Sequence, residues 1–331
     1  MNRGFKDVVK RIIFGDTLLP RDFTLGLPDP QNEVSVWLQG LATPLDVTHQ
    51  YSMACTDPFT ICIAFAPGLI VPEHSRNPLT LQFCERGGPQ RLLGQIGLKP
   101  AAISPHADQP TLRFFEAVTA NIYCLARRHL WAHSMLRAFS NRKRRQQTGA
   151  LSVLDGRAMI VNFIRPHTVV LVSALSETRG TMFPMNITGD LGDGRFGLAL
   201  QAANQPARIV EAAGRIAVST VPLAQAQFTY RLSANHSRKS IDWGELPFAT
   251  KPSTRLEIPV PVFALRVREM EIEQVYRMGR HTFFVARIVS DERLSDRLAL
   301  HTIHGYYQTL RLKGRPDELA ASLLDDASNK S

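Results

Sequence analysis

The sequence predicts a mainly β fold with added helices, which places the protein in the α+β class. Short runs of β-branched and aromatic residues, separated by turn residues, recur along the chain with the length of strands. Helical periodicity is rare, and in the second half no helices of ten or more residues separate the strands, which argues against an alternating βαβ array. At 331 residues the chain exceeds the usual size of a single core, so we expect two domains.

The first half combines strands with a helix at each end. Apolar residues in 5–14 recur with helical spacing, which predicts a short amphipathic helix. Residues 123–145 contain no glycine or proline and place apolar residues on one stripe, so we expect a long helix that runs into the basic segment 141–147. We place a domain boundary after this helix, which gives an N-terminal α+β domain at 1–149 with no assigned role. The strands expected within it include 34–38 and 59–65.

The second half is mostly strand. One short helix is expected at 207–213, because Pro206 suits the first position of a helix. This half forms a predicted second domain at 150–313, followed by a polar tail at 314–331. Its expected strands are 158–164, 167–174, 196–201, 215–221, 262–275 and 282–289.

Gly192, Gly194 and Gly197 have the G-x-G-x-x-G spacing of a dinucleotide-binding loop. Such a loop opens a helix long enough to pack on a sheet, and an acidic residue follows about 20 positions later. Pro206 follows Gly197 by only nine positions, and the first acidic residue, Glu211, by 14. We therefore interpret these glycines as turn residues of a hairpin.

Lysine and arginine total 39 against 29 for aspartate and glutamate, an excess of ten that suits nucleic acid, acidic lipid or a phosphate-bearing cofactor. No nucleic-acid module surrounds the basic segment 141–147, which we interpret as a solvated helix end. No apolar stretch approaches the ~20 residues of a membrane span, and the N-terminal segment lacks a signal-peptide core. We therefore expect a cytoplasmic protein without a nucleic-acid or membrane partner.

No metal site is expected. His129 and His133 are four apart on the expected long helix, but no acidic residue or cysteine stands at a fitting distance from them in the sequence. The cysteines form no C-x-x-C pair, so neither a zinc site nor a disulfide framework is indicated, and we interpret them as small buried apolar residues. They are Cys55, Cys62, Cys84 and Cys124.

Three segments of the second half, in order over about 158–310, are similar to the flavin reductase-like family, the FMN-binding split barrels. They are IRPHTVVLVSALSETRGTMFPMNIT, ARIVEAAGRIAVSTVP and LEIPVPVFALRVREMEIEQVYRMGRHTFFVARIV. The stretch GRHTFFV matches a Gly-Asp-His-Thr stretch of the family except at Arg280. The resemblance implies a split β-barrel, FMN as cofactor and NADH or NADPH as a possible electron donor.

The resemblance also implies site residues, each with a structural alternative. His281 is the candidate near the nicotinamide or substrate, although a histidine at a strand start is often only structural. Arg280 in place of the family's aspartate puts reductase activity in doubt, and Asn204 and Pro206 stand where the family has an arginine and a threonine. His301 and His304 either close the pocket or pack in the core, and we favour packing.

The cofactor-binding residues implied fall in three groups. A loop that faces the flavin ring, or else belongs to the barrel core, contains Met182, Phe183, Pro184, Met185 and Asn186. The start of the short helix and a polar loop are the candidate phosphate sites, the loop being otherwise an ordinary solvated surface. The helix start contains Asn204, Ala207 and Arg208, and the polar loop contains His236, Ser237, Arg238 and Lys239.

The first half weakly repeats the second. Residues 34–68 have the strand, turn, loop and strand layout of 169–204. We therefore expect the first half to be a degenerate split barrel or part of one. It would pack at the position that a homodimer partner occupies in the resembled family. The protein is then expected to be a homodimer or an intramolecular pseudo-dimer. The function expected is that of an NAD(P)H-dependent flavin reductase or related oxidoreductase. The alternative is a flavin- or ligand-binding module without turnover.

Overall fold

A computed structural model describes residues 22–311, apart from 69–77, 87–90, 103–110, 126–129, 131–150 and 178. Several sequence predictions lie outside the described residues. These are the helix at 5–14, most of the helix at 123–145, the basic segment 141–147, the histidine pair at 129 and 133, and the tail at 314–331. The boundary after residue 149 also lies outside them and stays a prediction.

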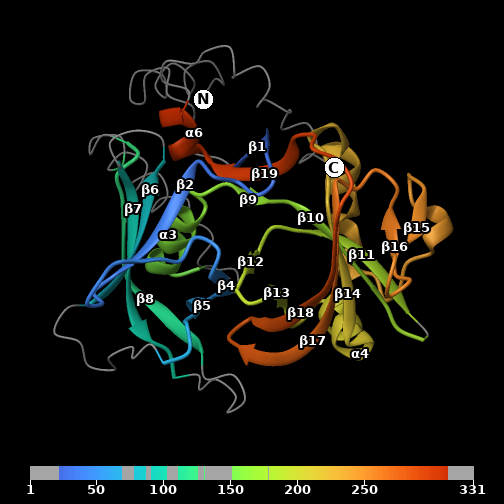
Figure 1. Ribbon diagram of the computed structural model, residues 1–331, viewed down its shortest axis with the longest axis horizontal. Coiled ribbons are helices and arrows are strands. Elements are labelled where there is room, and N and C mark those ends of the chain that lie inside the picture. Colours follow the sequence, from blue (N-terminus) through green and yellow to red (C-terminus); the bar gives the residue numbers. More distant parts are fainter. Residues whose placement is uncertain are drawn as a thin grey trace, which may run out of the picture.

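Two seven-stranded antiparallel sheets dominate the molecule and stand side by side (Figure 1). The first has the spatial order β3-β2-β6-β7-β8-β5-β4. Its strands are β2 (Val34–Gln39), β3 (Leu45–Asp46), β4 (Tyr51–Thr56), β5 (Phe59–Ala64), β6 (Leu79–Glu85), β7 (Leu92–Pro100) and β8 (Leu112–Ile122).

The second sheet has the order β11-β10-β14-β17-β18-β13-β12. When each sheet's strands are numbered along the chain, both sheets read second, first, fifth, sixth, seventh, fourth, third. The mainly β class with added helices is confirmed, and both halves share one strand order. The strands of the second sheet are β10 (Val170–Leu175), β11 (Gly180–Met185), β12 (Thr188–Asp190), β13 (Arg195–Gln201), β14 (Arg215–Thr220), β17 (Arg266–Met278) and β18 (His281–Arg293).

A three-stranded sheet links the two halves. It consists of β1 (Asp22–Leu27), β19 (Ala299–His304) and β9 (His167–Thr168), with β19 in the middle. Helix α6 (Gly305–Arg311) follows β19, and its Tyr306 and Tyr307 join the core of the first sheet. The chain therefore returns to the first half after it has built the second.

Helix α3 (Val153–Asn162) corrects the expected strand at 158–164. The Ser152 side chain caps its N-terminus by accepting a hydrogen bond from the Asp155 amide. Ala158, Val161 and other apolar residues of the helix pack in the core of the first sheet. A short apolar run does not distinguish a buried strand from a buried helix segment, which explains the error.

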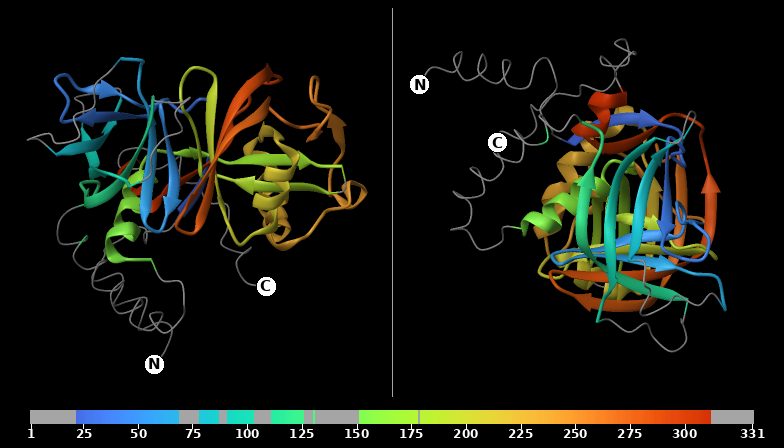
Figure 2. Two further views of the ribbon diagram at one scale, coloured as in Figure 1. Left: turned by 90° about the horizontal axis from the view of Figure 1, so that it is seen from below. Right: turned by 90° about the vertical axis from the view of Figure 1, so that its left-hand side faces the viewer.

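The second sheet carries additional elements, and α4 (Gln205–Ala213) includes the helix expected at 207–213. The others lie between β14 and β17, and Figure 2 shows the hairpin of β15 and β16 on the side away from the first sheet. They are η1 (Leu223–Gln225), α5 (Ala226–Arg231), η2 (Leu232–Ser237), η3 (Trp243–Glu245), β15 (Thr250–Pro252) and β16 (Pro259–Pro261).

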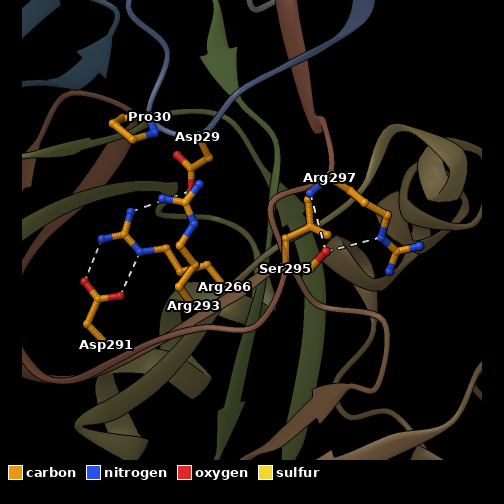
Figure 3. A pocket seen from close by; sticks show the side chains of 8 residues that line it. Asp29, Pro30, Arg266, Asp291, Arg293, Ser295 and Arg297 are labelled. Atoms are coloured by element: carbon orange, nitrogen blue, oxygen red, sulfur yellow. Dashed lines mark hydrogen bonds and ion pairs between the residues drawn. The ribbon is translucent and has the colours of Figure 1, made fainter.

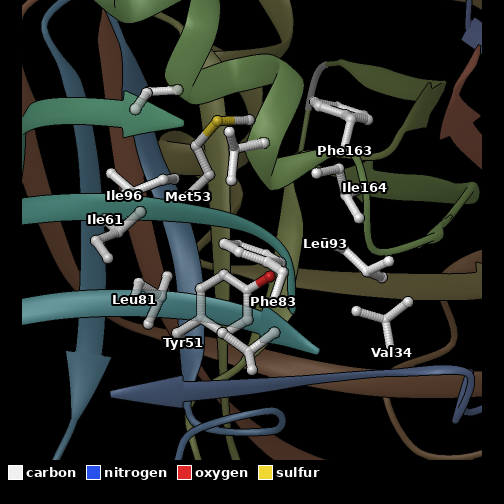
Figure 4. Packing of buried hydrophobic residues seen from close by; sticks show 14 of the residues in the cluster. Val34, Tyr51, Met53, Ile61, Leu81, Phe83, Leu93, Ile96, Phe163 and Ile164 are labelled. Atoms are coloured by element: carbon white, nitrogen blue, oxygen red, sulfur yellow. The ribbon is translucent and has the colours of Figure 1, made fainter. Parts of the chain in front are cut away.

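Each sheet has its own apolar core, and a third cluster joins them. Figure 4 shows the first core, in which Tyr51 and Phe83 pack edge to face. The joining cluster contains Phe114 of the first sheet and Phe283 of the second, again edge to face with ring centroids 6.0 Å apart. All four cysteines are buried and free, which confirms their interpretation as small apolar residues.

The glycine-rich segment forms the β12–β13 hairpin, as interpreted from the sequence. Gly192, Asp193 and Gly194 have φ values of 67°, 48° and 69°, which suit a tight turn. Gly197 lies within β13, where a Cβ would come within 2.8 Å of the Ser52 side chain of the first sheet. No helix in the described part of the chain has the length and apolar composition that a membrane span requires.

Candidate functional site

The loop expected to face a flavin is mostly enclosed by protein. Met182 and Phe183 lie in β11 with no exposed surface, and Pro184 is also buried. The Phe183 side chain belongs to the core of the second sheet, whereas Met182 packs beneath α5 and η2. Only Met185 and Asn186, where the strand ends, are partly accessible.

The polar loop expected as a phosphate site contacts this strand through η2. The Asn235 side chain donates to the Met182 carbonyl at 2.8 Å. His236 Nε2 donates to the Pro184 carbonyl at 3.2 Å, and its ring lies 5.0 Å from that of Phe183. Burial lowers the pKa of His236, against the opposing effect of this hydrogen bond.

The three remaining residues of that loop face solvent. Ser237, Arg238 and Lys239 are exposed. The Ser237 hydroxyl donates to the Ala234 carbonyl at 3.0 Å. Asn235, which the sequence prediction did not select, therefore holds the loop on β11, while Arg238 and Lys239 extend into water.

The N-terminus of α4 offers free backbone donors. Its first residue follows Asn204, whose side chain makes no capping hydrogen bond, and the first turn carries no acidic residue. The first N–H groups of a helix have no intrahelical partner and attract anions. Arg208 is exposed in this turn, whereas Ala207 is buried and can contribute only its backbone.

The strand register brings the chain that follows β11 and the start of α4 to the edge of the second sheet formed by β13 and β12. The Ala199 amide donates to the Ile187 carbonyl at 3.2 Å, and two residues later Gln201 pairs with His281. The Ala202 amide donates to the Arg280 carbonyl at 2.9 Å. Because neighbouring strands are about 5 Å apart, Ile187, the start of α4 and the β17–β18 turn lie within a few strand spacings.

His281 faces the joining cluster rather than solvent. It is 3% exposed, and its Nδ1 lies 3.6 Å from Cys55 Sγ of the first sheet. Burial lowers the pKa of His281, and the Arg280 charge lowers it further, while Asp57 acts in the opposite direction. Arg280 Nε lies 3.0 Å from Asp57 Oδ2, so Arg280 makes an ion pair between the halves.

A polar cluster that the sequence did not predict as a unit lies where the linking sheet meets Asn186. The Asn186 side chain donates to Thr302 Oγ1 at 3.1 Å. Thr302 pairs in register with His167, whose Nε2 lies 3.1 Å from the Asn162 carbonyl. Burial, assisted by the Arg165 charge, lowers the pKa of His167 to about 4.

Arg165 is the cation of this polar cluster. It is partly buried, and its guanidinium carbon lies 5.7 Å from the centre of the Tyr51 ring. His301 is fully buried and hydrogen-bonds Thr168 at 3.0 Å, so His301 packs as we favoured. The members come from distant parts of the sequence, and no spacing motif could have joined them.

A cavity of about 310 Å³ lies at the other end of β17 and β18 (Figure 3). Arg266 makes two hydrogen bonds to Asp291, of 2.7 and 2.6 Å, and also lies 3.6 Å from Asp29. Its guanidinium is therefore already neutralised by protein carboxylates. None of the residues predicted to bind a cofactor lines this cavity.

Among the residues that the structure describes, no group of three His, Cys, Asp or Glu side chains is arranged to hold a metal ion. No protein-family model and no curated protein matches the chain. Among solved structures, the chain is similar to an FMN-binding protein from Thermus thermophilus with bound p-hydroxybenzaldehyde. That match has 24% identity and a TM-score of 0.37, and it covers 41% of this chain and 81% of the other.

Two flavin reductases are also similar in structure. An NADH:FAD oxidoreductase from Streptomyces globisporus has 17% identity and a TM-score of 0.38, over 44% of this chain and 86% of the other. The styrene monooxygenase flavin reductase from Pseudomonas putida has 21% identity and a TM-score of 0.36, over 43% of this chain and 90% of the other. Each of these similarities covers less than half of this chain.

Proposed function

We propose that this protein binds FMN at the edge of the second sheet and acts as a flavin-dependent oxidoreductase reduced by NADH or NADPH. The observation that carries the proposal is the convergence of unused donors and partly accessible side chains at that edge. They come from the start of α4 and from Met185 and Asn186. When bound, FMN supplies hydride acceptance at N5 of its ring, and the protein supplies position and electrostatics.

The phosphate end of FMN fits the start of α4. Free N–H groups of the first turn and the exposed Arg208 guanidinium favour a doubly charged anion, and no acidic side chain of that turn opposes it. Asn204 would lie beside the phosphate. The absence of the arginine and threonine that the resembled family has here leaves the backbone as the main donor.

The ring end fits less completely. Met185 offers the ring an apolar contact and Asn186 a polar one. Met182, Phe183 and Pro184 are covered by protein, so their side chains would not contact the ring and would only fix the path of the backbone. Apolar walls with a few polar groups are typical of such sites. His236, partly accessible beside Pro184, completes the set of groups near the ring.

The shared strand order of the two sheets supports an intramolecular pseudo-dimer over a homodimer. The first sheet contacts the second through β4, which lies against β12, β13 and β18. A single chain thus provides both sides of the junction next to the proposed site. We further propose a cytoplasmic location, where NADH and NADPH are present.

The substitution Asn204→Asp tests the phosphate assignment. A carboxylate at this position would cap the free N–H groups and repel phosphate, so FMN affinity should fall about tenfold. Riboflavin, which lacks the phosphate, should bind as it does to the wild type. The control is Asn121→Asp, at an exposed position of β8, and unchanged FMN affinity of the Asn204 variant would contradict the assignment.

A second function, flavin binding without turnover, is favoured by one observation. His281, the candidate near the nicotinamide, is buried against Cys55 and is not presented to a substrate. Anaerobic addition of NADH or NADPH to the FMN-loaded protein separates the two functions, because only the oxidoreductase loses its yellow colour. A protein that stays colourless after incubation with FMN contradicts both.

A further inference from the structure

Arg165 is a partly buried cation with no counter-ion in the part of the chain that the structure describes. Its Nε is buried and has no hydrogen-bond partner, and no carboxylate in the described ranges forms an ion pair with it. Its guanidinium lies beside Tyr51, with the ring centre 5.7 Å away, and also interacts with the neutral Tyr51 hydroxyl, so this neighbour supplies no negative charge. Removing a guanidinium from water without a paired anion is costly, so an unpaired arginine at this depth needs an explanation.

The groups around Arg165 do not neutralise it. The Arg165 charge contributes to the lowered pKa values of His49, His167 and His301, with burial as the larger cause in each case, and these imidazoles are neutral at pH 7. Four carboxylates act on the same histidines, but each of them has another arginine as its partner. The pairs are Asp190 with Arg268 at 2.6 Å, Asp46 with Arg86 at 3.1 Å, Glu33 with Arg311 at 2.8 Å and Asp29 with Arg266 at 3.6 Å.

Arg165 is connected to the polar end of the proposed site through His167. It lies two residues before His167 and its charge acts on that imidazole, which interacts with the Asn186 backbone, and the Asn186 side chain bonds Thr302 in the neighbouring strand. Asn186 is partly accessible, as is Arg165 itself. The unpaired charge and the accessible polar edge of the site thus occur together, between the two sheets.

We infer that Arg165 binds the negatively charged edge of the ligand held at this site. For FMN, which the proposed function assigns to it, that edge is N1–C2=O of the ring, where negative charge accumulates on reduction. The inference rests on the proposed function and adds a residue outside the predicted loops. A cation at this edge favours the reduced flavin and any adduct that places charge there.

Sulfite titration of the FMN-loaded protein measures this effect without turnover. The sulfite sulfur donates its lone pair to form a bond with N5, the displaced electron pair moves to N1–C2=O, and no group leaves. Arg165→Gln should weaken sulfite binding about tenfold or more, and Arg165→Lys should restore most of it. Arg231→Gln is the matched control, because Arg231 also lies beside an aromatic ring, 5.8 Å from that of Phe228, but is exposed and has no proposed role in ligand binding.

Arg165→Met keeps the aliphatic part of the side chain beside Tyr51 and serves as a second variant in case Arg165→Gln does not fold. A folded, FMN-loaded variant with wild-type sulfite affinity would overturn the role of Arg165 and leave FMN binding intact. Equal loss in the Arg231 variant would overturn it as well, because the effect would not be local. A wild-type protein that takes up no FMN removes the proposed function and this inference together.

Discussion

The two seven-stranded sheets share a strand order but differ in what is built on them. The first connects its fifth and sixth strands, β6 and β7, through residues 86–91, whereas the second spans 221–265 between β14 and β17. At the end of its second strand, β3, the first sheet places Asp46, which binds Arg86 and the Thr48 amide. Directly after its second strand, β11, the second sheet leaves Asn186 partly accessible. The shared order preserves the junction, while the groups proposed to bind the phosphate and the ring body of FMN are carried by the second sheet.

If the junction makes the two sheets one folding unit, Phe283→Ala should destabilise the protein strongly and cause the largest of the expected effects. Phe283 has no exposed surface and packs edge to face on Phe114 of the other sheet. Losing a buried phenyl ring costs about 3–5 kcal/mol in the free energy of unfolding. Denaturant unfolding followed by tryptophan fluorescence and by circular dichroism should give one common transition at lower denaturant.

Val262→Ala is the control, because Val262 is 55% exposed and should change stability by less than about 0.5 kcal/mol. Two separate transitions in the Phe283 variant, with one unchanged from the wild type, would show that the sheets fold independently. The two halves would then be two independently folding domains and not one folding unit.

A glycine at the junction should be the next most sensitive position. Gly279 has φ of 52°, and a Cβ there would collide with the Asp57 carbonyl of the first sheet. Gly279→Ala should therefore cost about 3 kcal/mol, the sum of backbone strain and steric overlap. Chemical denaturation at pH 7 measures the change.

Gly214→Ala separates the two causes. Gly214 ends α4 with φ of 63° and would meet nothing within 4 Å, so only the backbone strain of about 1 kcal/mol applies. Equal costs at the two positions would mean that the first sheet can move away from Gly279 and that the junction is loose.

Much of the fold was predictable because strands leave a local signal. The runs at 34–38 and 196–201 lie in strands, and those at 59–65 and 215–221 exceed theirs by one residue, since β-branched and aromatic residues suit a pleated surface. The short helix was found through Pro206, which lies in its first turn. The run at 158–164 was misassigned because its helical state depends on the Ser152 cap and on packing against the first sheet.

The candidate site was predictable only in part. The segments that carry Asn186, Asn204 and His236 were selected through the family resemblance, and the register brings the first two toward one sheet edge. Burial of Phe183 and the position of Arg165 depend on contacts between residues far apart in sequence, which no local pattern encodes. The assignment of each residue to a ligand stays a prediction.

The linking sheet should make the contact between the halves sensitive to acid through His167. Its pKa is lowered to about 4 by burial and by Arg165, against about 6.5 in the unfolded chain. The folded state therefore binds fewer protons, and the stability is fully present above pH 6.5 and is lost as pH falls toward 4. The loss attributable to His167 is about 2 kcal/mol at pH 5.

His167→Gln removes this titration, so the difference in unfolding free energy between pH 7.5 and pH 5 should shrink by about that amount. His236→Gln is the comparison variant, because His236 also has a lowered pKa but lies in η2 beside Pro184 of β11, outside the linking sheet. An unchanged pH dependence in the His167 variant would mean that other groups carry the acid sensitivity of the junction.

The smallest effect on stability is expected where the two sheets differ most in chemistry. Asp46 and Arg86 are 39% and 40% exposed in their side chains, and an exposed ion pair contributes about 1 kcal/mol or less. Asp46→Ala should therefore hardly change stability or FMN affinity. Asn186→Ala, at the corresponding end of the second strand of the second sheet, should leave stability nearly unchanged but weaken FMN binding several-fold, because the proposed polar contact to the ligand is lost. Isothermal titration of FMN into both variants measures the contrast.

If the Asp46 variant loses FMN affinity and the Asn186 variant does not, the ligand lies on the first sheet, and the division of roles between the two sheets is reversed.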